Sequence, residues 1–221
     1  MFNDQEYIIV SDFDGTITLE DSNDRLIKAF GNAEVNQIEA DFMVGKVSNR
    51  RAFELIFDVM HITADQYKEF ITADINIDPK FDEFLELVHK RAITLLIVSA
   101  GFRQAVEYVL GTQRLENVEV YANDLLGEPY IKPIFATKNP DCDKPIGPCG
   151  NCKRECLKMI RQKSGRKILY IGDGITDRCV IEEVDILLAK DYLAKYCDEH
   201  GLPYVPFSDF ADVSKYLQIQ P

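Results

Sequence analysis

Two aspartates stand two residues apart directly after a short apolar run near the start of the chain. The run is Tyr7-Ile8-Ile9-Val10, and Asp12 and Asp14 follow it in Asp12-Phe13-Asp14-Gly15-Thr16-Ile17-Thr18. A β-branched run bounded by turn residues is typical of a strand in a parallel sheet, and ligands of such sheets bind beyond the carboxyl ends of the strands. Two carboxylates so close together need a cation or a shared proton to offset their repulsion. The pattern therefore predicts a metal site at a strand end.

Two other interpretations of this segment compete with the metal site. An EF-hand calcium loop needs glycine at its sixth position and glutamate at its twelfth, whereas Gly15 is fourth and Asn23 is twelfth here. An ordinary Asp-Gly turn after a strand fits the same seven residues as well as a metal site does. The choice between these two therefore depends on the rest of the chain.

Length and composition limit the class of protein. The chain has 221 residues, of which 46% are hydrophobic and 28% charged, as in an ordinary globular domain or a core with a modest insertion. No apolar stretch reaches the roughly 18 residues of a membrane span. The first residues, Met1-Phe2-Asn3-Asp4, lack the basic segment of a secretory signal. We therefore expect a cytoplasmic protein that does not enter a membrane.

The net charge of -12 makes extended polyanions unfavourable partners. No run of lysine and arginine mixed with aromatic residues offsets it locally, so we expect no nucleic acid and no anionic membrane as partner. A small phosphorylated metabolite fits, because a divalent cation and one lysine dominate their own site and distant charges are screened beyond about 10 Å. The oligomeric state is left open by the sequence.

The patterns of helix and strand divide the chain into a core and an inserted block. Residues 21–73 carry apolar faces at helical spacing and no clear strand pattern. Strands and helices then alternate, which is typical of an α/β fold with a doubly wound parallel sheet. We expect a core of residues 1–19 and 77–221, with an α-helical cap over 20–76. The predicted helices are 81–90, 102–110, 154–162, 175–183, 192–200 and 209–217, the predicted strands are 93–98, 118–121, 167–171 and 185–188, and a hairpin is predicted over 127–135.

Three further segments place polar groups near predicted strand ends. Ser99-Ala100-Gly101 follows strand 93–98, and the N–H groups of a helix start suit an anion. Gly172-Asp173-Gly174-Ile175-Thr176-Asp177 follows strand 167–171 and offers a second pair of acids for a metal. Lys153 could reach a phosphoryl group from the start of helix 154–162. The ordinary alternatives are a helix N-cap for the serine, a capped turn for the two acids and a solvated surface position for the lysine.

In this order, the four segments resemble the four motifs of the haloacid dehalogenase superfamily. The motifs are Asp-x-Asp-Gly-Thr-x-Thr at 12–18, Ser99, Lys153 and Gly-Asp-Gly-x-Thr-Asp at 172–177. The resemblance spans essentially the whole chain, and the helical insertion is similar to the cap of the branch that contains phosphoserine phosphatase. It implies a Rossmannoid α/β core and a phosphomonoester hydrolase, whereas a dehalogenase needs neither a second acid at position 14 nor Mg²⁺.

The resemblance also implies a role for each motif residue. Asp12 is expected to be the nucleophile that forms an aspartyl phosphate, and Asp14 the general acid and base. Asp12, the Asp14 backbone carbonyl and Asp173 are expected to hold Mg²⁺. Asp177 is expected to orient Lys153 or a water on the metal.

The remaining candidate contacts lie around the phosphoryl group and in the cap. The phosphoryl oxygens are expected to contact Lys153 and Ser99 together with the backbone of three residues, Gly15, Ala100 and Gly101. In the cap, Asp21 and Arg51 are candidate substrate contacts. For Arg51 and its neighbour Arg50, a solvated helix surface is the favoured alternative.

Two details narrow the resemblance within this branch. The cysteine-rich stretch before Lys153 and the tail from Ala189 to Phe210 are similar to the 2-hydroxy-3-keto-5-methylthiopentenyl-1-phosphate phosphatases of methionine salvage. The phosphocholine/phosphoethanolamine phosphatases have a similar cysteine stretch, so their substrates and phosphoserine remain alternatives. A non-catalytic interaction module stabilised by metal or thiolates is the alternative of another class, but the intact acids favour an enzyme.

Four cysteines gather in the stretch before the helix of Lys153. The spacing of Cys149 and Cys152, with Cys142 and Cys156 nearby, suits a thiolate Zn²⁺ site or, in an oxidising compartment, a disulfide. A cytoplasmic location favours reduced thiols, and four-cysteine zinc sites usually pair two short knuckles. We therefore expect Mg²⁺ as the cofactor, with Zn²⁺ at the cysteines as a second candidate.

Overall fold

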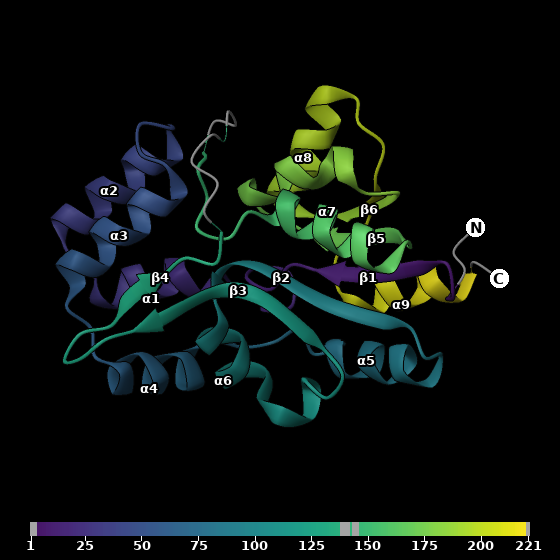
Figure 1. Cartoon of the computed structure of the whole chain (residues 1–221), viewed down its shortest axis with the longest axis horizontal. Coiled ribbons are helices and arrows are strands. Elements are labelled where there is room, and N and C mark those ends of the chain that lie inside the picture. The colour runs from purple at the N-terminus through teal and green to yellow at the C-terminus, as the bar shows by residue number, and fades with distance from the viewer. Residues whose placement is uncertain (1–3, 138–141, 143–145, 220–221) are drawn as a thin grey trace.

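The computed structural model describes residues 4–137, 142 and 146–219, and it contains a seven-stranded sheet with helices on both faces (Figure 1). Residues 1–3 and 220–221 of the predicted core lie outside the described residues. Residues 1–3 also belong to the segment from which we expect no secretory signal. In the described part of the chain, no helix is long and apolar enough to cross a bilayer.

The sheet is almost entirely parallel, with its first strand near the middle. The order is β4-β3-β2-β1-β5-β6-β7, and only the β3–β4 pair is antiparallel. Val10 of β1 lies beside Leu96 of β2 and Tyr170 of β5. The chain thus crosses from one side of β1 to the other, and the crevice for ligands lies at such a switch point. The doubly wound fold predicted from the sequence is confirmed. The strands are β1 (Tyr7–Ser11), β2 (Thr94–Phe102), β3 (Glu119–Leu126), β4 (Lys132–Ile134), β5 (Lys167–Gly172), β6 (Ile186–Ala189) and β7 (Val205–Pro206).

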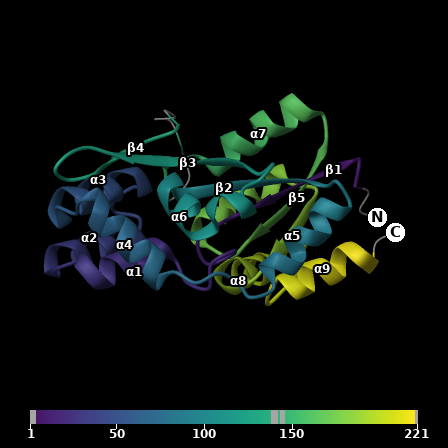
Figure 2. The same ribbon diagram turned by 90° about the horizontal axis from the view of Figure 1, so that it is seen from below.

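Helices cover both faces of the sheet because its central strands are apolar on both sides. The helices α5 (Phe81–Lys90), α6 (Arg103–Arg114) and α9 (Phe210–Ile219) lie on one face (Figures 1 and 2). On the opposite face lie α7 (Lys153–Ser164), α8 (Asp191–His200) and a 3₁₀ helix, η1 (Ile175–Glu183).

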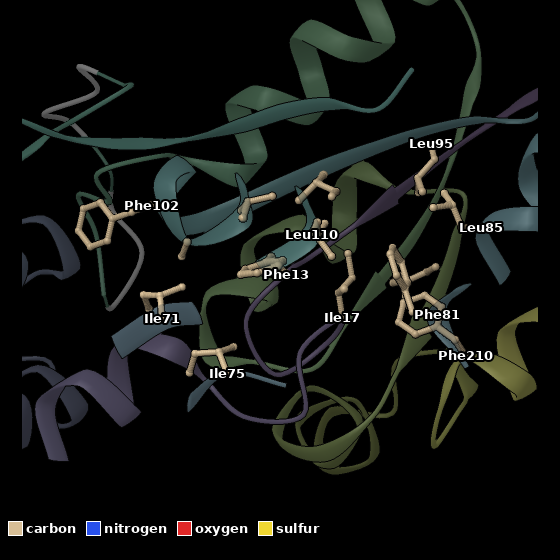
Figure 3. Packing of buried hydrophobic residues seen from close by; sticks show 14 of the residues in the cluster. Phe13, Ile17, Ile71, Ile75, Phe81, Leu85, Leu95, Phe102, Leu110 and Phe210 are labelled. Atoms are coloured by element: carbon tan, nitrogen blue, oxygen red, sulfur yellow. The ribbon is translucent and has the colours of Figure 1, made fainter. Parts of the chain in front are cut away.

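Alternate residues of the strands supply two hydrophobic cores. Ile9 belongs to the core under α5, α6 and α9, and its neighbour Val10 belongs to the core under α7 and α8. In the first core, Phe13 and Ile17 from the turn after β1 lie among the buried side chains (Figure 3). Their complete burial anchors that turn, at about 1.5–3 kcal/mol for each such side chain.

The structure differs from the sequence predictions in several elements. The segment 175–183 is a 3₁₀ rather than an α-helix, and the Asp177 carboxylate accepts a hydrogen bond from Gly174 N at its start. Strand β3 continues to Leu126 and helix α6 to Arg114, past the predicted ends at 121 and 110. Strand β2 continues to Phe102, past the predicted end at 98. The two-residue strand β7 at the sheet edge was not predicted.

Four helices lie between β1 and α5 and form one end of the molecule (Figure 1). They are α1 (Ser22–Phe30), α2 (Ala33–Met43), α3 (Asn49–Met60) and α4 (Ala64–Asp74). The four N-cap side chains, Asp21, Asn32, Ser48 and Thr63, accept hydrogen bonds from N–H groups of the first turns, so local sequence fixes where the helices begin.

Two chain segments that lie side by side connect this block to the sheet. Leu19 N donates to Asn76 O at 2.9 Å, and Asp78 N donates to Ile17 O at 2.8 Å. These bonds flank the predicted cap boundaries of 20 and 76. The division into a core and a cap that act as separate domains stays a prediction.

Candidate active site

A cavity of about 280 Å³ lies where the strand ends meet the helical block. From the core it is lined by the predicted residues Asp12, Asp14, Ser99, Ala100, Gly101, Lys153 and Asp173, and from the block by Asp21. Segments that are far apart in the sequence therefore meet at the switch point beside β1. This agrees with the prediction that the polar segments follow the ends of parallel strands.

A buried lysine bridges two of the acids. Lys153 Nζ donates to Asp12 Oδ2 at 2.7 Å and to Asp177 Oδ1 at 2.6 Å. Burial alone would lower the pKa of Lys153, but the charges of the two carboxylates raise it above its ordinary value. The surface-lysine alternative is wrong, because only 3% of this residue is exposed. The start of α7 thus delivers a permanent positive charge to the end of β1.

Three carboxylates converge beside this lysine. Asp12, Asp173 and Asp177 each offer an oxygen within 4.8 Å of the others. Burial, followed by the charge of Asp177, raises the pKa of Asp12 well above its ordinary value and that of Asp173 to about 7. The pKa of Asp177 is lowered despite its burial, because Lys153 and hydrogen bonds stabilise its charge.

This acidic group fits a hard divalent cation. Its donors are all carboxylate oxygens, which Mg²⁺ prefers, and the three carboxylates lie beside a single ammonium group, that of Lys153. Asp173 is oriented by Thr16, whose hydroxyl donates to Oδ1 at 2.5 Å. Gly15 has φ +74°, and a Cβ there would collide with the Asp173 carboxylate, so the close approach of the two segments requires glycine.

Asp14 is held apart from the other acids. Its Oδ1 accepts hydrogen bonds from Ser22 N at 3.0 Å and from the Ser22 hydroxyl, and its Oδ2 accepts one from Ser99 Oγ at 3.3 Å. Burial and then the charge of Asp21 raise the pKa of Asp14 to about 7, although the bonds from Ser22 oppose the shift. A carboxyl group with this pKa can both give and take a proton near neutrality.

Ser99 lies within a strand and not at a helix start. It belongs to β2, its Oγ accepts from Gly101 N at 2.9 Å, and α6 begins only at Arg103. The N-cap alternative is therefore wrong, because the strand continues past the serine. At Gly101 a Cβ would lie 2.6 Å from Asp14 Oδ2, so a side chain there would displace the acid.

Three residues that support the site were not found from the sequence. Asn151 Nδ2 donates to Ser99 O at 2.9 Å and to Tyr121 O at 3.0 Å, and Asn123 Nδ2 donates to Ala100 O at 2.8 Å. Together with Ser22 they fix the strand ends and the second acid. Buried asparagine and serine have no distinctive spacing, so only the position of Asn151, two residues before Lys153, offered a signal.

The two candidate contacts from the helical block are separated in the structure. Asp21 lines the cavity and also caps α1 by accepting from the N–H groups of Asn23 and Asp24. Arg51 does not line the cavity: it pairs with Glu54 at 2.8 Å and lines a groove beside β4. Arg51 lies on the exposed surface of α3, as the favoured alternative of a solvated helix surface expects.

The cysteines do not form a metal centre among the described residues. The only group of three or more His, Cys, Asp or Glu side chains placed to share an ion there is the acidic one described above. Cys142, Cys149, Cys152 and Cys156 are free thiols, and burial raises the pKa of Cys149 and of Cys156 to about 12. A Zn²⁺ site at the cysteines is not supported, and neither is a disulfide.

A doubly wound sheet whose strand ends hold buried carboxylates around one lysine suits the binding of a divalent cation and a phosphoryl group. A model of the haloacid dehalogenase-like hydrolases matches residues 9–182, and the chain belongs to this family. The resemblance found in the sequence is thereby confirmed, and the chain is a phosphatase of this type.

Two curated relatives match nearly the whole chain. Pdp3-interacting factor 1 of Schizosaccharomyces pombe is 30% identical, over 99% of this chain and 97% of its own length. A 2-hydroxy-3-keto-5-methylthiopentenyl-1-phosphate phosphatase of Geobacillus kaustophilus is 30% identical, over 97% of this chain and 96% of its own. A substrate-bound phosphoserine phosphatase has the same fold, with a TM-score of 0.70 at 18% identity over 95% of this chain and 97% of that one.

Proposed function

We propose that this phosphatase depends on Mg²⁺ and hydrolyses a small phosphorylated metabolite through an aspartyl phosphate on Asp12. The observation that carries the proposal is the different setting of the first two acids. Asp12 lies 2.7 Å from the Lys153 ammonium, among the acids that fit a metal, whereas Asp14 is held by Ser22 and Ser99 with a pKa of about 7. One is suited to attack phosphorus and the other to move protons.

Two steps follow from this division of roles. A carboxylate oxygen of Asp12 forms a bond to phosphorus while the bond to the leaving oxygen breaks, and Asp14 gives that oxygen its proton. Asp14, now ionised, takes a proton from the attacking water, and the bond between Asp12 and phosphorus breaks to release inorganic phosphate. The raised pKa of Asp14 supports both parts, since neither protonation state is strongly disfavoured near neutrality.

The other residues position the phosphoryl group. Lys153 and Ser99 line the cavity and suit the non-bridging oxygens, and Asp177 keeps the lysine in place. The N–H groups of Gly15 and Gly101, which the resemblance assigned to the phosphoryl group, donate instead to Thr18 Oγ1 and Ser99 Oγ. Asp12, Asp173 and the Asp14 carbonyl would hold Mg²⁺. When bound, the ion supplies the positive charge that offsets the crowded carboxylates and the phosphoryl oxygens.

As substrate we propose 2-hydroxy-3-keto-5-methylthiopentenyl-1-phosphate, with hydrolysis in the cytoplasm. Relatives of that name match almost the full length of the chain at 27–30% identity. The block side of the cavity adds Ile27, Phe42, Phe53 and Ile56, which suit a methylthio group. Phosphocholine and phosphoethanolamine are the second candidates, because Asp21, Asp24 and Glu39 line the same side and suit a cation.

A panel of phosphomonoesters tests the proposal. Purified enzyme with Mg²⁺ is assayed for phosphate release from the methylthiopentenyl ester, phosphocholine, phosphoethanolamine, phosphoserine and p-nitrophenyl phosphate. The proposal expects the highest kcat/KM for the methylthiopentenyl ester. Trapping of phosphorus on Asp12, detected by mass spectrometry after acid quench, tests the covalent intermediate separately. Hydrolysis without any phosphorylated protein, or with label on another residue, would contradict the assignment of Asp12.

A further inference from the structure

The cavity has two electrostatically different ends. At the core end, the acids face Lys153 and fit a metal. At the block end, Asp21, Asp24 and Glu39 line the wall. Among the described residues that line the cavity, Lys153 is the only lysine, arginine or histidine, and its ammonium already contacts Asp12 and Asp177. A leaving group that extends toward the block therefore meets carboxylates and no basic side chain.

Four basic residues of the helical block have partners that do not line the cavity. Arg25 pairs with Glu20 and Asp74, and Lys46 pairs with Asp41. Arg50 lies over the ring of Phe135 at 4.6 Å, and its guanidinium donates to Thr137 O. Neither these side chains nor Arg51 line the cavity. An anionic leaving group would need such a side chain, since carboxylates are recognised best by the forked donors of arginine.

The acids at the block end are close enough to influence one another. Desolvation of its carboxylate, followed by the charge of Glu39, raises the pKa of Asp24, although the residue as a whole is exposed. Burial and then the charge of Asp24 raise the pKa of Asp21. Lys28 offsets part of this on the surface of α1, but it does not line the cavity. The rest of the wall there is apolar, with Ile27, Phe42, Phe53 and Ile56, so water screens charges less than on an open surface.

We propose that the block end of the cavity excludes leaving groups that carry a carboxylate, so that the enzyme selects phosphomonoesters whose leaving group bears no negatively charged substituent. This inference rests on the proposed phosphatase function and deepens it by naming the substrate class. It removes phosphoserine and other phosphorylated carboxylates from the candidates. Specificity of this kind comes from repulsion of the wrong substrate as much as from attraction of the right one.

Two matched pairs of substrates isolate the effect of one carboxylate. O-phosphoserine differs from phosphoethanolamine only by a carboxylate, and 2-phosphoglycolate differs from 2-hydroxyethyl phosphate by a carboxylate in place of a CH₂OH group. In both pairs kcat/KM should be lower for the carboxylate by about tenfold or more. The difference should shrink when the ionic strength rises from about 0.02 M to about 0.5 M, because salt screens repulsion but leaves a steric misfit unchanged. Equal kcat/KM values within a pair would overturn the proposal.

Charge variants locate the effect. Glu39→Gln and Asp24→Asn should narrow the gap within each pair, and Glu39→Arg should raise kcat/KM for phosphoserine above its wild-type value. Glu34→Gln is the matched control, because it removes the same charge from an exposed position on the same helix that does not line the cavity. If Glu34→Gln narrowed the gap as much as Glu39→Gln, net charge and not the cavity wall would be responsible.

The outcomes separate this inference from the proposed function. Hydrolysis of both members of each pair at equal rates would overturn the selection against anions and leave the phosphatase proposal intact. A folded, Mg²⁺-loaded protein that releases phosphate from no ester, including p-nitrophenyl phosphate, would overturn both.

Discussion

The two ends of the cavity are built on different principles. At the core end, the polar atoms are held by hydrogen bonds from several elements: Asp12 meets Lys153 from α7, Asp173 meets Thr16, and Asp14 meets Ser22 and Ser99. At the block end, helices contribute apolar side chains and three carboxylates. Under the proposed function, the core end would fix the phosphoryl group shared by all substrates, while the block end would meet only the part that varies.

Because the core end is a network, substitutions there should cost more than substitutions at the block end. Removing one member changes the charge or geometry of its partners as well. At the block end a substitution alters a contact with one portion of one substrate. The expected effects below therefore decrease from the core end outward.

Asp12→Asn should cause the largest loss. The amide cannot attack phosphorus, and the pairing with Lys153 is weakened, so kcat should fall by roughly 1,000-fold or more for every substrate. Phosphate release and acid-quench mass spectrometry measure the loss, and circular dichroism checks that the variant is folded. Activity above a tenth of wild type would contradict the covalent mechanism.

Removal of divalent metal should be nearly as severe and also reversible. With excess chelator, hydrolysis of all esters should stop, and added Mg²⁺ should restore it, because Asp12, Asp173 and Asp177 then regain their compensating charge. Ca²⁺ should inhibit, since its larger and looser coordination sphere spoils the alignment of the attack. Full activity in chelator would show that the acidic group works without an ion.

Asp14→Asn should slow hydrolysis by roughly 100-fold or more when the leaving group needs a proton. The effect should be smaller for p-nitrophenyl phosphate, whose leaving group is stable as an anion. The ratio of the two losses, measured as kcat under saturating substrate, reports general acid catalysis directly. Equal losses for both substrates would instead indicate that Asp14 mainly supports the geometry of the site.

The pH dependence of kcat/KM should shift in opposite directions in Ser22→Ala and Asp21→Asn. The protonated Asp14 needed by poor leaving groups persists up to its pKa of about 7, so their kcat/KM should fall as the pH rises through that value. Ser22→Ala removes the hydroxyl hydrogen bond that lowers this pKa and keeps the backbone one, so the fall should move to higher pH. Asp21→Asn removes a charge that raises it, so the fall should move to lower pH, and asparagine keeps the N-cap of α1. Shifts in the same direction would contradict the assignment.

The same contrast explains what the sequence could reveal. Asp12, Asp173 and Lys153 were found because polar residues directly follow apolar strands or begin a helix, and parallel topology brings such points together. Asn151 and Asn123 were missed because they act through backbone carbonyls: Asn151 donates to carbonyls of β2 and β3, and Asn123 of β3 donates to β2. Such contacts arise only when the strands are in register.

At the block end, the sequence could predict helices but not their rotation. Asp21, which adjoins the first motif, lines the cavity, whereas Arg51 was a candidate only by its charge. Whether position 51 faces the cavity depends on how α3 packs against α2 and β4, and no local spacing encodes that. The acids Asp24 and Glu39 went unnoticed for the same reason, because charged residues on amphipathic helices usually face solvent.

Arg51→Ala should have the smallest effect of these variants, because the residue belongs to the block but does not line the cavity. The arginine is exposed, pairs with Glu54 across one turn of α3 and lines the groove beside β4, so its loss should change stability by less than about 1 kcal/mol. Because it does not line the cavity, kcat/KM values across the ester panel should keep their wild-type ranking. A changed ranking, and above all a selective loss for anionic leaving groups, would show that α3 turns toward the cavity when substrate is bound. The block end would then contain a cation after all, and the proposed selection against negative charge would have to be abandoned along with the fixed division between the two ends.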